Sequence, residues 1–279
     1  MNEKTLSGLS KLHNIVRLSL LASLVFFVIG LFALVSHWDS AVLIIIAACL
    51  FRLVAVGLAR RKYNAEWMKA SSKAAAERQC GPVSYDARET APDTLVTDLG
   101  FAPDVQLTPN TLLFHVIRGN MSDCSFRLAE TAFVRLSGKR KTPGSKSVAG
   151  TLITVENALP EDEKWAFLIN HSLEGICPMI EYDRSTWKPV DVSCPGAVCF
   201  SANGKTDSLE TVSAVIRSKL SKQDAALAAE GGKLSLMLPG VYYARKADIT
   251  KAPTETMLNG ISIPVLDLMK EILDKLRKP

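Results

Sequence analysis

Two apolar runs before residue 60 limit what this chain can fold into. Leu18–Val35 is 18 residues long without a charge, and Ala41–Leu58 is equally long and is interrupted only by Arg52. At about 1.5 Å per residue, each run forms a helix of roughly 27 Å, close to the hydrocarbon thickness of a bilayer. Residues 36–40 connect the two runs. The sequence therefore predicts a hairpin of two transmembrane helices within residues 1–62.

A cleaved signal peptide is the alternative explanation for the first run. The run is long for a signal peptide, it lacks a small-x-small cleavage site before a polar segment, and a second apolar run follows at once. These features favour an anchor.

Basic residues on the flanks of the hairpin predict its orientation. The connecting loop has no Lys or Arg, whereas both outer flanks are basic. By the positive-inside rule, we expect a multi-pass protein of the cell inner membrane whose N-terminus and C-terminal domain are cytoplasmic. The flanking residues are Lys4, Lys11, Arg17, Arg60, Arg61 and Lys62. The last three are expected to contact lipid headgroups.

Arg52 lies inside the second predicted span. A charge at this depth costs about 2.5–3.5 kcal/mol on insertion scales, so a ligand site or a proton relay is one interpretation. The favoured interpretation is that Arg52, six residues inside Leu58, extends its side chain toward the cytoplasmic headgroups. Folding the hairpin at its loop places Arg52 near Ser23 on the first helix. Neither span contains an acidic residue, which disfavours a relay.

The excess of positive over negative charge lies entirely within residues 1–62, the predicted anchor. The chain has 33 Lys and Arg and 28 Asp and Glu, and residues 1–62 hold seven of the former and two of the latter. The remainder therefore carries 26 of each and is neutral. Nucleic-acid binding depends on neutralising phosphates with basic residues, so we expect no nucleic-acid partner.

Residues 63–110 are predicted to form a juxtamembrane helix followed by a linker. The segment 59–79 is rich in helix formers and has no Gly or Pro. Residues 81–110 contain four prolines, which favours a linker.

Residues 111–279 are predicted to form a cytoplasmic α+β domain with a mixed, mainly antiparallel sheet and packed helices. Alternating or continuous apolar runs bounded by turn residues indicate strands. The predicted strands are Leu112–Ile117, Cys124–Leu136, Ser147–Val155, Trp165–Asn170, Val190–Ser193, Ala197–Ser201, Leu234–Leu238 and Val241–Arg245. Helices are predicted from Asp207, after a capping pattern, and from Ser262, with Pro264 in the first turn. The first helix is expected to run on, or to restart at Ser221, as far as Gly231-Gly232.

A search for catalytic or metal-binding patterns predicts no catalytic residue, no metal and no cofactor. A zinc site drawn from His171, Cys177, Cys194 and Cys199 has poor spacing and no C-x₂-C pair. No P-loop, nucleophile elbow or H-E-x-x-H helix is present. A nucleophile pair of Cys177, Cys194 or Cys199 with His115 or His171 remains an alternative. The acidic run Glu161–Glu163 is predicted to be a solvated turn.

One basic loop lies within the domain. Lys139, Arg140, Lys141 and Lys146 occupy a predicted hairpin tip. The simpler interpretation is a soluble turn. The functional interpretation is contact with an anionic membrane surface, where each basic residue contributes about 1 kcal/mol.

The layout resembles a bacterial family known only as a domain of unknown function, number 3137 in that series. Phe126–Glu130 resembles the family's strand that ends in a glutamate, and Val148–Ile153 resembles its glycine-containing strand, although the family tends to have aromatic residues where this chain has Val148-Ala149. Pro178–Leu220 is similar to its paired strands and helix. The resemblance covers most of residues 15–277 and implies no catalytic residue or substrate.

The leading hypothesis is an uncharacterised, non-enzymatic module that binds a protein or lipid partner at the inner face of the membrane. The alternative is a membrane-tethered hydrolase or thiol enzyme that uses a Cys/His pair. A homo-oligomer through the hairpin is a further interpretation, because small residues allow helices to pack closely. These residues are Gly30, Ala47, Ala48 and Gly57.

Overall fold

The structure of the chain is a computed structural model that describes residues 3–36, 40–92, 95, 105–106, 112–135, 147–169, 188–191, 197–220 and 223–277. It divides into two compact units. The first consists of Met1–Ala75 and Ala244–Ser262, and the second of Ala76–Tyr243 and Ile263–Pro279. Each unit is described by itself. The predicted boundaries after residues 62 and 110 stay a prediction, and a segment near the C-terminus belongs to the first compact unit.

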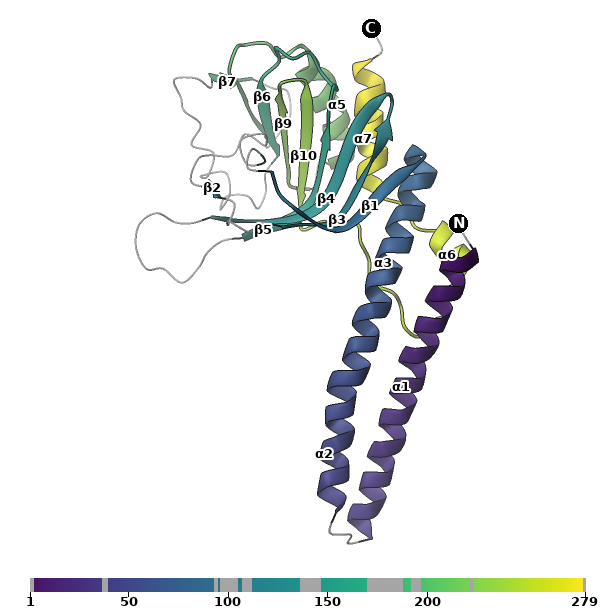
Figure 1. The fold of residues 1–279 in the computed structure, drawn as a ribbon. Helices are drawn as coiled ribbons and strands as arrows, with labels where there is room; N and C mark the ends of the chain where they lie inside the picture. Colours follow the sequence, from purple (N-terminus) through teal and green to yellow (C-terminus); the bar gives the residue numbers. More distant parts are fainter. Residues whose placement is uncertain are drawn as a thin grey trace, which may run out of the picture. The chain divides into compact units, whose positions relative to one another are not determined.

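Long helices dominate the first unit, and α1 and α2 lie side by side (Figure 1). The helix α1 spans Glu3–Val35, and α2 (Ala41–Phe51), the π-helical η1 (Arg52–Val56) and α3 (Gly57–Cys80) follow one another without a break. Two helices, Glu3–Val35 and Ala41–Cys80, are therefore long and apolar enough to cross a membrane. The juxtamembrane helix predicted over 59–79 corresponds to α3.

The remaining part of the first unit is Ala244–Ser262, which we call the return segment. It contains one short helix, α6 (Glu255–Asn259), whose N-terminus is capped by the side chain of Thr254, which accepts a hydrogen bond from the backbone N–H of Met257 at 3.2 Å. The strand predicted at Val241–Arg245 is wrong. The chain turns after β10 at Gly240, which has φ 72°, and residues 241–245 pair with no strand among the described residues.

The second unit is an α+β domain built on one antiparallel sheet, which confirms the predicted fold class. Its order is β1-β3-β4-β5-β10-β9-β6-β8-β7, and β2 pairs with β4. Every pairing among the described strands is antiparallel. The strands are β1 (Val83–Thr90), β2 (Val105–Gln106), β3 (Leu112–Met121), β4 (Cys124–Arg135), β5 (Ser147–Val155), β6 (Trp165–Ile169), β7 (Lys188–Val190), β8 (Ala197–Ser201), β9 (Ala225–Glu230) and β10 (Lys233–Pro239).

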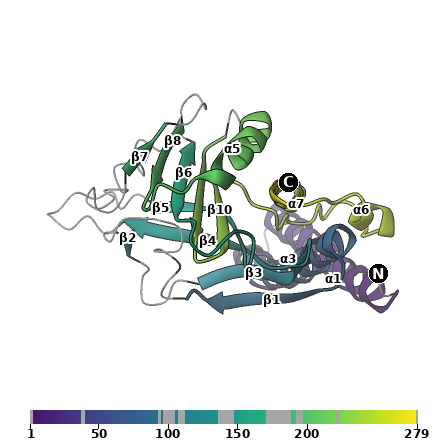
Figure 2. The same ribbon diagram turned by 90° about the horizontal axis from the view of Figure 1, so that it is seen from above.

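Two helices lie on one side of this sheet (Figure 2). They are α5 (Asp207–Leu220) and α7 (Pro264–Leu276), and they contact one another. Each turns an apolar stripe inward, as the 3.6-residue spacing of its apolar residues predicts. The end of α3 holds the start of α7, because the Gln79 side chain donates to the Ile263 carbonyl at 3.2 Å and accepts from the Ile263 N–H at 3.1 Å.

Three strands, β1, β2 and β9, lie where the sequence predicted other structure. Ala225–Glu230 is β9, although its alanines had suggested a helix. Its small side chains lie opposite large ones on β6, with Ala229 paired to Trp165, so the sheet environment outweighs helix propensity. Gly231 and Gly232, with φ 58° and 76°, form the two-residue turn into β10. The strand β1 lies within the predicted linker, where it pairs with β3.

Candidate functional site

Apart from Arg52, the exposed surface of the hairpin is mainly apolar over both spans. Large side chains such as Leu18, Phe32 and Leu53 are 65%, 67% and 75% exposed. Small residues face inward instead, and Gly30 packs so closely that an added Cβ would lie 2.7 Å from Ile45 Cγ1. Contiguous exposed apolar surface of this extent is typical of a membrane-embedded segment.

Of the residues proposed for oligomer contacts, Gly30 and Ala48 are buried inside the hairpin itself. Gly57 faces open space. The interpretation that these residues mediate a homo-oligomer stays a prediction, and two of the four positions already pack within one chain.

Arg52 and Ser23 line the same cavity between α1 and the second helix, as folding the hairpin at its loop suggested. The cavity has a volume of about 100 Å³, and its walls are completed by Phe27, Ala48 and Cys49. The Ser23 side chain is 3% exposed. Arg52 is the first residue of η1, and π-helical turns are rare and often occur at functional sites. Among the described residues, no side chain forms an ion pair or hydrogen bond with the Arg52 guanidinium.

The return segment packs against the parts of α1 and α3 that lie beyond the apolar spans. Leu258 of α6 is fully buried in a cluster with Tyr63, Trp67 and Leu9. A buried histidine adds a polar contact, since His13 Nε2 lies 3.0 Å from the carbonyl oxygen of Ile249. Burial raises the pKa of the Tyr63 hydroxyl, and the charge of Asp248 raises it further.

This cluster was not predicted from the sequence. The signal on the helices is the spacing of Tyr63 and Trp67, four residues apart, and of Leu9, His13 and Val16 on α1, which places each set on one helix face. No comparable pattern marks the return segment, whose apolar residues are scattered between turns.

The part of the first unit beyond the apolar spans carries exposed basic side chains. The predicted headgroup-contact residues Arg60, Arg61 and Lys62 are exposed at the start of α3. The return segment adds Arg245, Lys246 and Lys251, which are also exposed. Lys251 lies 3.9 Å from Asp248, and at this exposure such a pair contributes little energy. The other predicted surface residues, Lys139, Arg140, Lys141 and Lys146, lie outside the described residues.

In the second unit, His115 occupies an irregular point of the sheet. It has φ 55°, and the β3–β4 register shifts between Phe114 and Ile117. A left-handed backbone is uncommon for a residue with a side chain, and bulges often lie near functional positions. The Tyr85 hydroxyl lies 2.7 Å from His115 Nδ1, and the Tyr243 hydroxyl donates to the His115 carbonyl.

Burial sets the protonation of this group. It lowers the pKa of the His115 imidazole, which favours the neutral ring. Burial also raises the pKa of the Tyr243 hydroxyl well above its ordinary value, with smaller contributions from Glu130 and Tyr85. The Tyr243 hydroxyl thus connects the turn after β10 to β3, and the Tyr85 hydroxyl of β1 contacts the ring of the same histidine.

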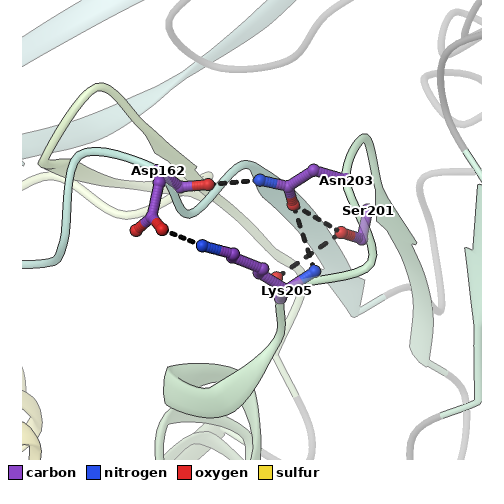
Figure 3. A network of polar contacts seen from close by, with 4 residues as sticks. All are labelled: Asp162, Ser201, Asn203 and Lys205. Atoms are coloured by element: carbon purple, nitrogen blue, oxygen red, sulfur yellow. Dashed lines mark hydrogen bonds and ion pairs between the residues drawn. The ribbon is translucent and has the colours of Figure 1, made fainter.

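A second polar group joins the loop before β6 to the loop between β8 and α5 (Figure 3). Lys205 forms an ion pair with Asp162, and the Asn203 amide donates to the Asp162 carbonyl. Asn203 Oδ1 accepts from the Lys205 N–H at 3.1 Å. The hydrogen bond to Lys205 lowers the pKa of Asp162. The ion pair and the hydrogen bonds connect two loops, so this polar group has a structural role.

The prediction that Glu161–Glu163 is a solvated acidic turn is wrong for Glu163, which is buried. Its side chain is 4% exposed. It accepts a hydrogen bond from Trp165 Nε1 at 2.9 Å and another from the Ser208 hydroxyl at the start of α5. A buried carboxylate requires such donors, and here they connect β6 to α5.

Of the residues in the alternative Cys/His pair, the structure describes only Cys199 and His115, and these two do not form a pair. Cys199 is buried on β8, and His115 lies on β3, six strands away in the sheet order. Burial raises the pKa of the Cys199 thiol to about 12, which opposes formation of a nucleophilic thiolate. His171, Cys177 and Cys194 lie outside the described residues. Within the described ranges, no three His, Cys, Asp or Glu side chains are grouped so that they could hold a metal ion.

Comparison of the chain with protein-family models, with curated proteins and with solved structures finds no match.

Proposed function

We propose that this chain is a non-enzymatic module anchored in the inner membrane of a bacterium, with its α+β domain presented to a protein or lipid partner at the cytoplasmic face. The observation that carries the proposal is the distribution of exposed side chains along the hairpin. Apart from the exposed Arg52, apolar residues cover the outside of both spans, and a run of exposed basic residues begins just after the second span, at Arg60.

The basic residues support an anionic membrane surface as the environment of the domain. Arg245, Lys246 and Lys251 of the return segment belong to the same unit as Arg60–Lys62. Each basic residue near an anionic leaflet contributes about 1 kcal/mol. The six residues together favour a face rich in acidic phospholipids, and by the positive-inside rule that face is cytoplasmic.

The arrangement of titratable groups in the domain favours binding over catalysis. His115, Glu163 and Asp162 are each engaged by hydrogen bonds or ion pairs within the fold. Cys199 is a buried thiol with a raised pKa. A nucleophile and a base within hydrogen-bond reach are needed for a thiol or serine hydrolase, and Cys199 and His115 do not form such a pair.

Topology fusions test the anchor and its orientation. We expect a fluorescent protein fused after Pro279 to fluoresce, and alkaline phosphatase fused at the same point to be inactive, because the phosphatase folds only outside the cytoplasm. A matched fusion after Ser36, between the spans, should give the opposite pair of results. Active phosphatase after Pro279, or release of the chain from membranes by alkaline carbonate, contradicts the proposal.

Photo-crosslinking in intact membranes tests the binding role. Tyr242 is 51% exposed and is the most exposed large apolar side chain of the domain among the described residues. A photoreactive residue there should give one discrete adduct, and the same residue at the exposed polar position Glu161 serves as the control. Equal labelling at both positions, or none at Tyr242, argues against a binding surface at this place.

A further inference from the structure

We infer that the cavity between the two membrane helices binds the phosphate of an acidic phospholipid through Arg52 and Ser23. The inference rests on the proposed membrane anchoring and names a ligand for the anchor itself. Its basis is the placement of one cation and one buried hydroxyl on the wall of a single cavity of about 100 Å³ inside an otherwise apolar hairpin.

Arg52 is exposed on the hairpin, and neither span supplies a counter-charge for it. Neither Leu18–Val35 nor Ala41–Leu58 contains an aspartate or a glutamate. In the described part of the chain, the guanidinium forms no ion pair. A charged group in hydrocarbon is normally paired or reaches the interface, so the partner of Arg52 is an anion that enters from the lipid phase.

The depth of Arg52 favours a lipid headgroup over a second protein. Arg52 is six residues from Leu58 and eleven from Ala41, so it lies roughly 9 Å inside the basic end of the span. An arginine side chain at this depth extends toward the headgroups, and local thinning of the bilayer brings a phosphate to meet it. The basic residues that begin at Arg60 enrich acidic lipids in the same leaflet.

The chemistry of the cavity wall fits a phosphate. A guanidinium donates two parallel hydrogen bonds to phosphate oxygens, which a lysine cannot reproduce. Ser23, 3% exposed, adds a hydroxyl donor from the opposite helix. The exposed side chains of Phe27 and Leu53, at 40% and 75%, provide apolar surface for an acyl chain.

Native mass spectrometry of the full chain released from nanodiscs tests the inference. In discs of mixed phosphatidylglycerol and phosphatidylcholine, the chain should retain one phosphatidylglycerol. Arg52→Gln should lower the retained fraction about tenfold, as expected for the loss of charge-assisted hydrogen bonds. Ser23→Ala and Arg52→Lys should each cause a smaller loss. Arg217→Gln, which removes the same charge from an exposed position on α5 of the domain, is the matched control and should change retention less than twofold.

Several outcomes overturn the inference. They are unchanged retention in Arg52→Gln, an equal loss in the Arg217→Gln control, or no preference for phosphatidylglycerol. Displacement of the lipid by excess inorganic phosphate points to a site for soluble phosphate instead. Loss of a co-purifying membrane protein in Arg52→Gln, with lipid retention unchanged, points to a carboxylate on another protein's helix. Alkaline extraction separates the two proposals: a chain that is inserted but shows no lipid preference refutes only this inference.

Discussion

Gly150 on β5 lies where the backbones of two central strands approach closely. A Cβ added at this position would lie 2.1 Å from the carbonyl oxygen of Leu238, and 3.0 Å from Leu238 C and Pro239 Cα. These are backbone atoms, so no side-chain rotation relieves the clash. Ordinary contact begins near 3.4 Å, and Gly150→Ala therefore requires the end of β10 to move by roughly 1.3 Å.

The magnitude follows from the contacts that this movement disturbs. Overpacking a well-packed site costs about 1–3 kcal/mol. The Gly240 N–H donates to the Ala149 carbonyl at 2.9 Å, and the Thr151 hydroxyl donates to the Val241 carbonyl at 2.7 Å. Each of these hydrogen bonds contributes about 0.5–1.5 kcal/mol. We expect Gly150→Ala to destabilise the domain by about 3 kcal/mol, which lowers its Tm by about 6–12 °C at this size.

Thermal unfolding of the full chain in detergent measures this effect, with intrinsic tryptophan fluorescence, to which the buried Trp165 of the domain contributes, as the signal. Gly119→Ala is the matched control in the same sheet, because an added Cβ there meets side-chain atoms, the nearest being Val83 Cγ1 at 2.8 Å. Those side chains can shift, so the cost should be below about 1.5 kcal/mol. If the Tm of Gly150→Ala falls no further than that of Gly119→Ala, the close backbone approach does not limit stability as argued.

Two further predictions concern titratable groups of the domain. The pKa of the Cys199 thiol is about 12, against an ordinary 9.0. At pH 8, iodoacetamide should therefore alkylate Cys199 about a thousandfold more slowly than an unperturbed thiol, and at the ordinary rate in denaturant. Rapid labelling of Cys199 in the native chain, mapped by mass spectrometry, contradicts its burial. His115 has a lowered pKa, so below pH 6.5 the unfolded state binds more protons than the folded state, and stability should fall as the pH drops from 6.5 toward the folded pKa. His115→Asn, which tolerates the left-handed backbone, should reduce this slope in Tm measured against pH, whereas an identical slope in both proteins assigns the effect to other groups.

The elements with regular periodicity could be predicted from the sequence. The apolar spans, the amphipathic helices α5 and α7, and strands such as β5 and β8 carry local patterns that only one type of element satisfies. The strand β9 could not be predicted in this way, because a run of alanines favours a helix until large residues of a neighbouring strand are opposite it. Only the turn signal of Gly231-Gly232 distinguishes the two cases.

In the candidate sites too, some contacts could be predicted from local sequence and others could not. The proximity of Arg52 and Ser23 could be predicted, because the length of a hairpin determines which residues face one another. The burial of Glu163 could not, since its donors Trp165 and Ser208 come from different elements. The burial of His13 depends likewise on a segment more than 200 residues away. Contacts of this kind are set by tertiary packing and leave no local periodicity.

The division of the chain has a consequence for how the domain could be released. The chain passes between its two units three times, after Ala75, after Tyr243 and after Ser262. A protease that cuts once, after Ala75, leaves the return segment bound to α1 and α3 through the buried Leu258. One such cut therefore leaves the second unit connected to a return segment that is packed in the core of the first, and its release requires further cuts or unfolding of that core.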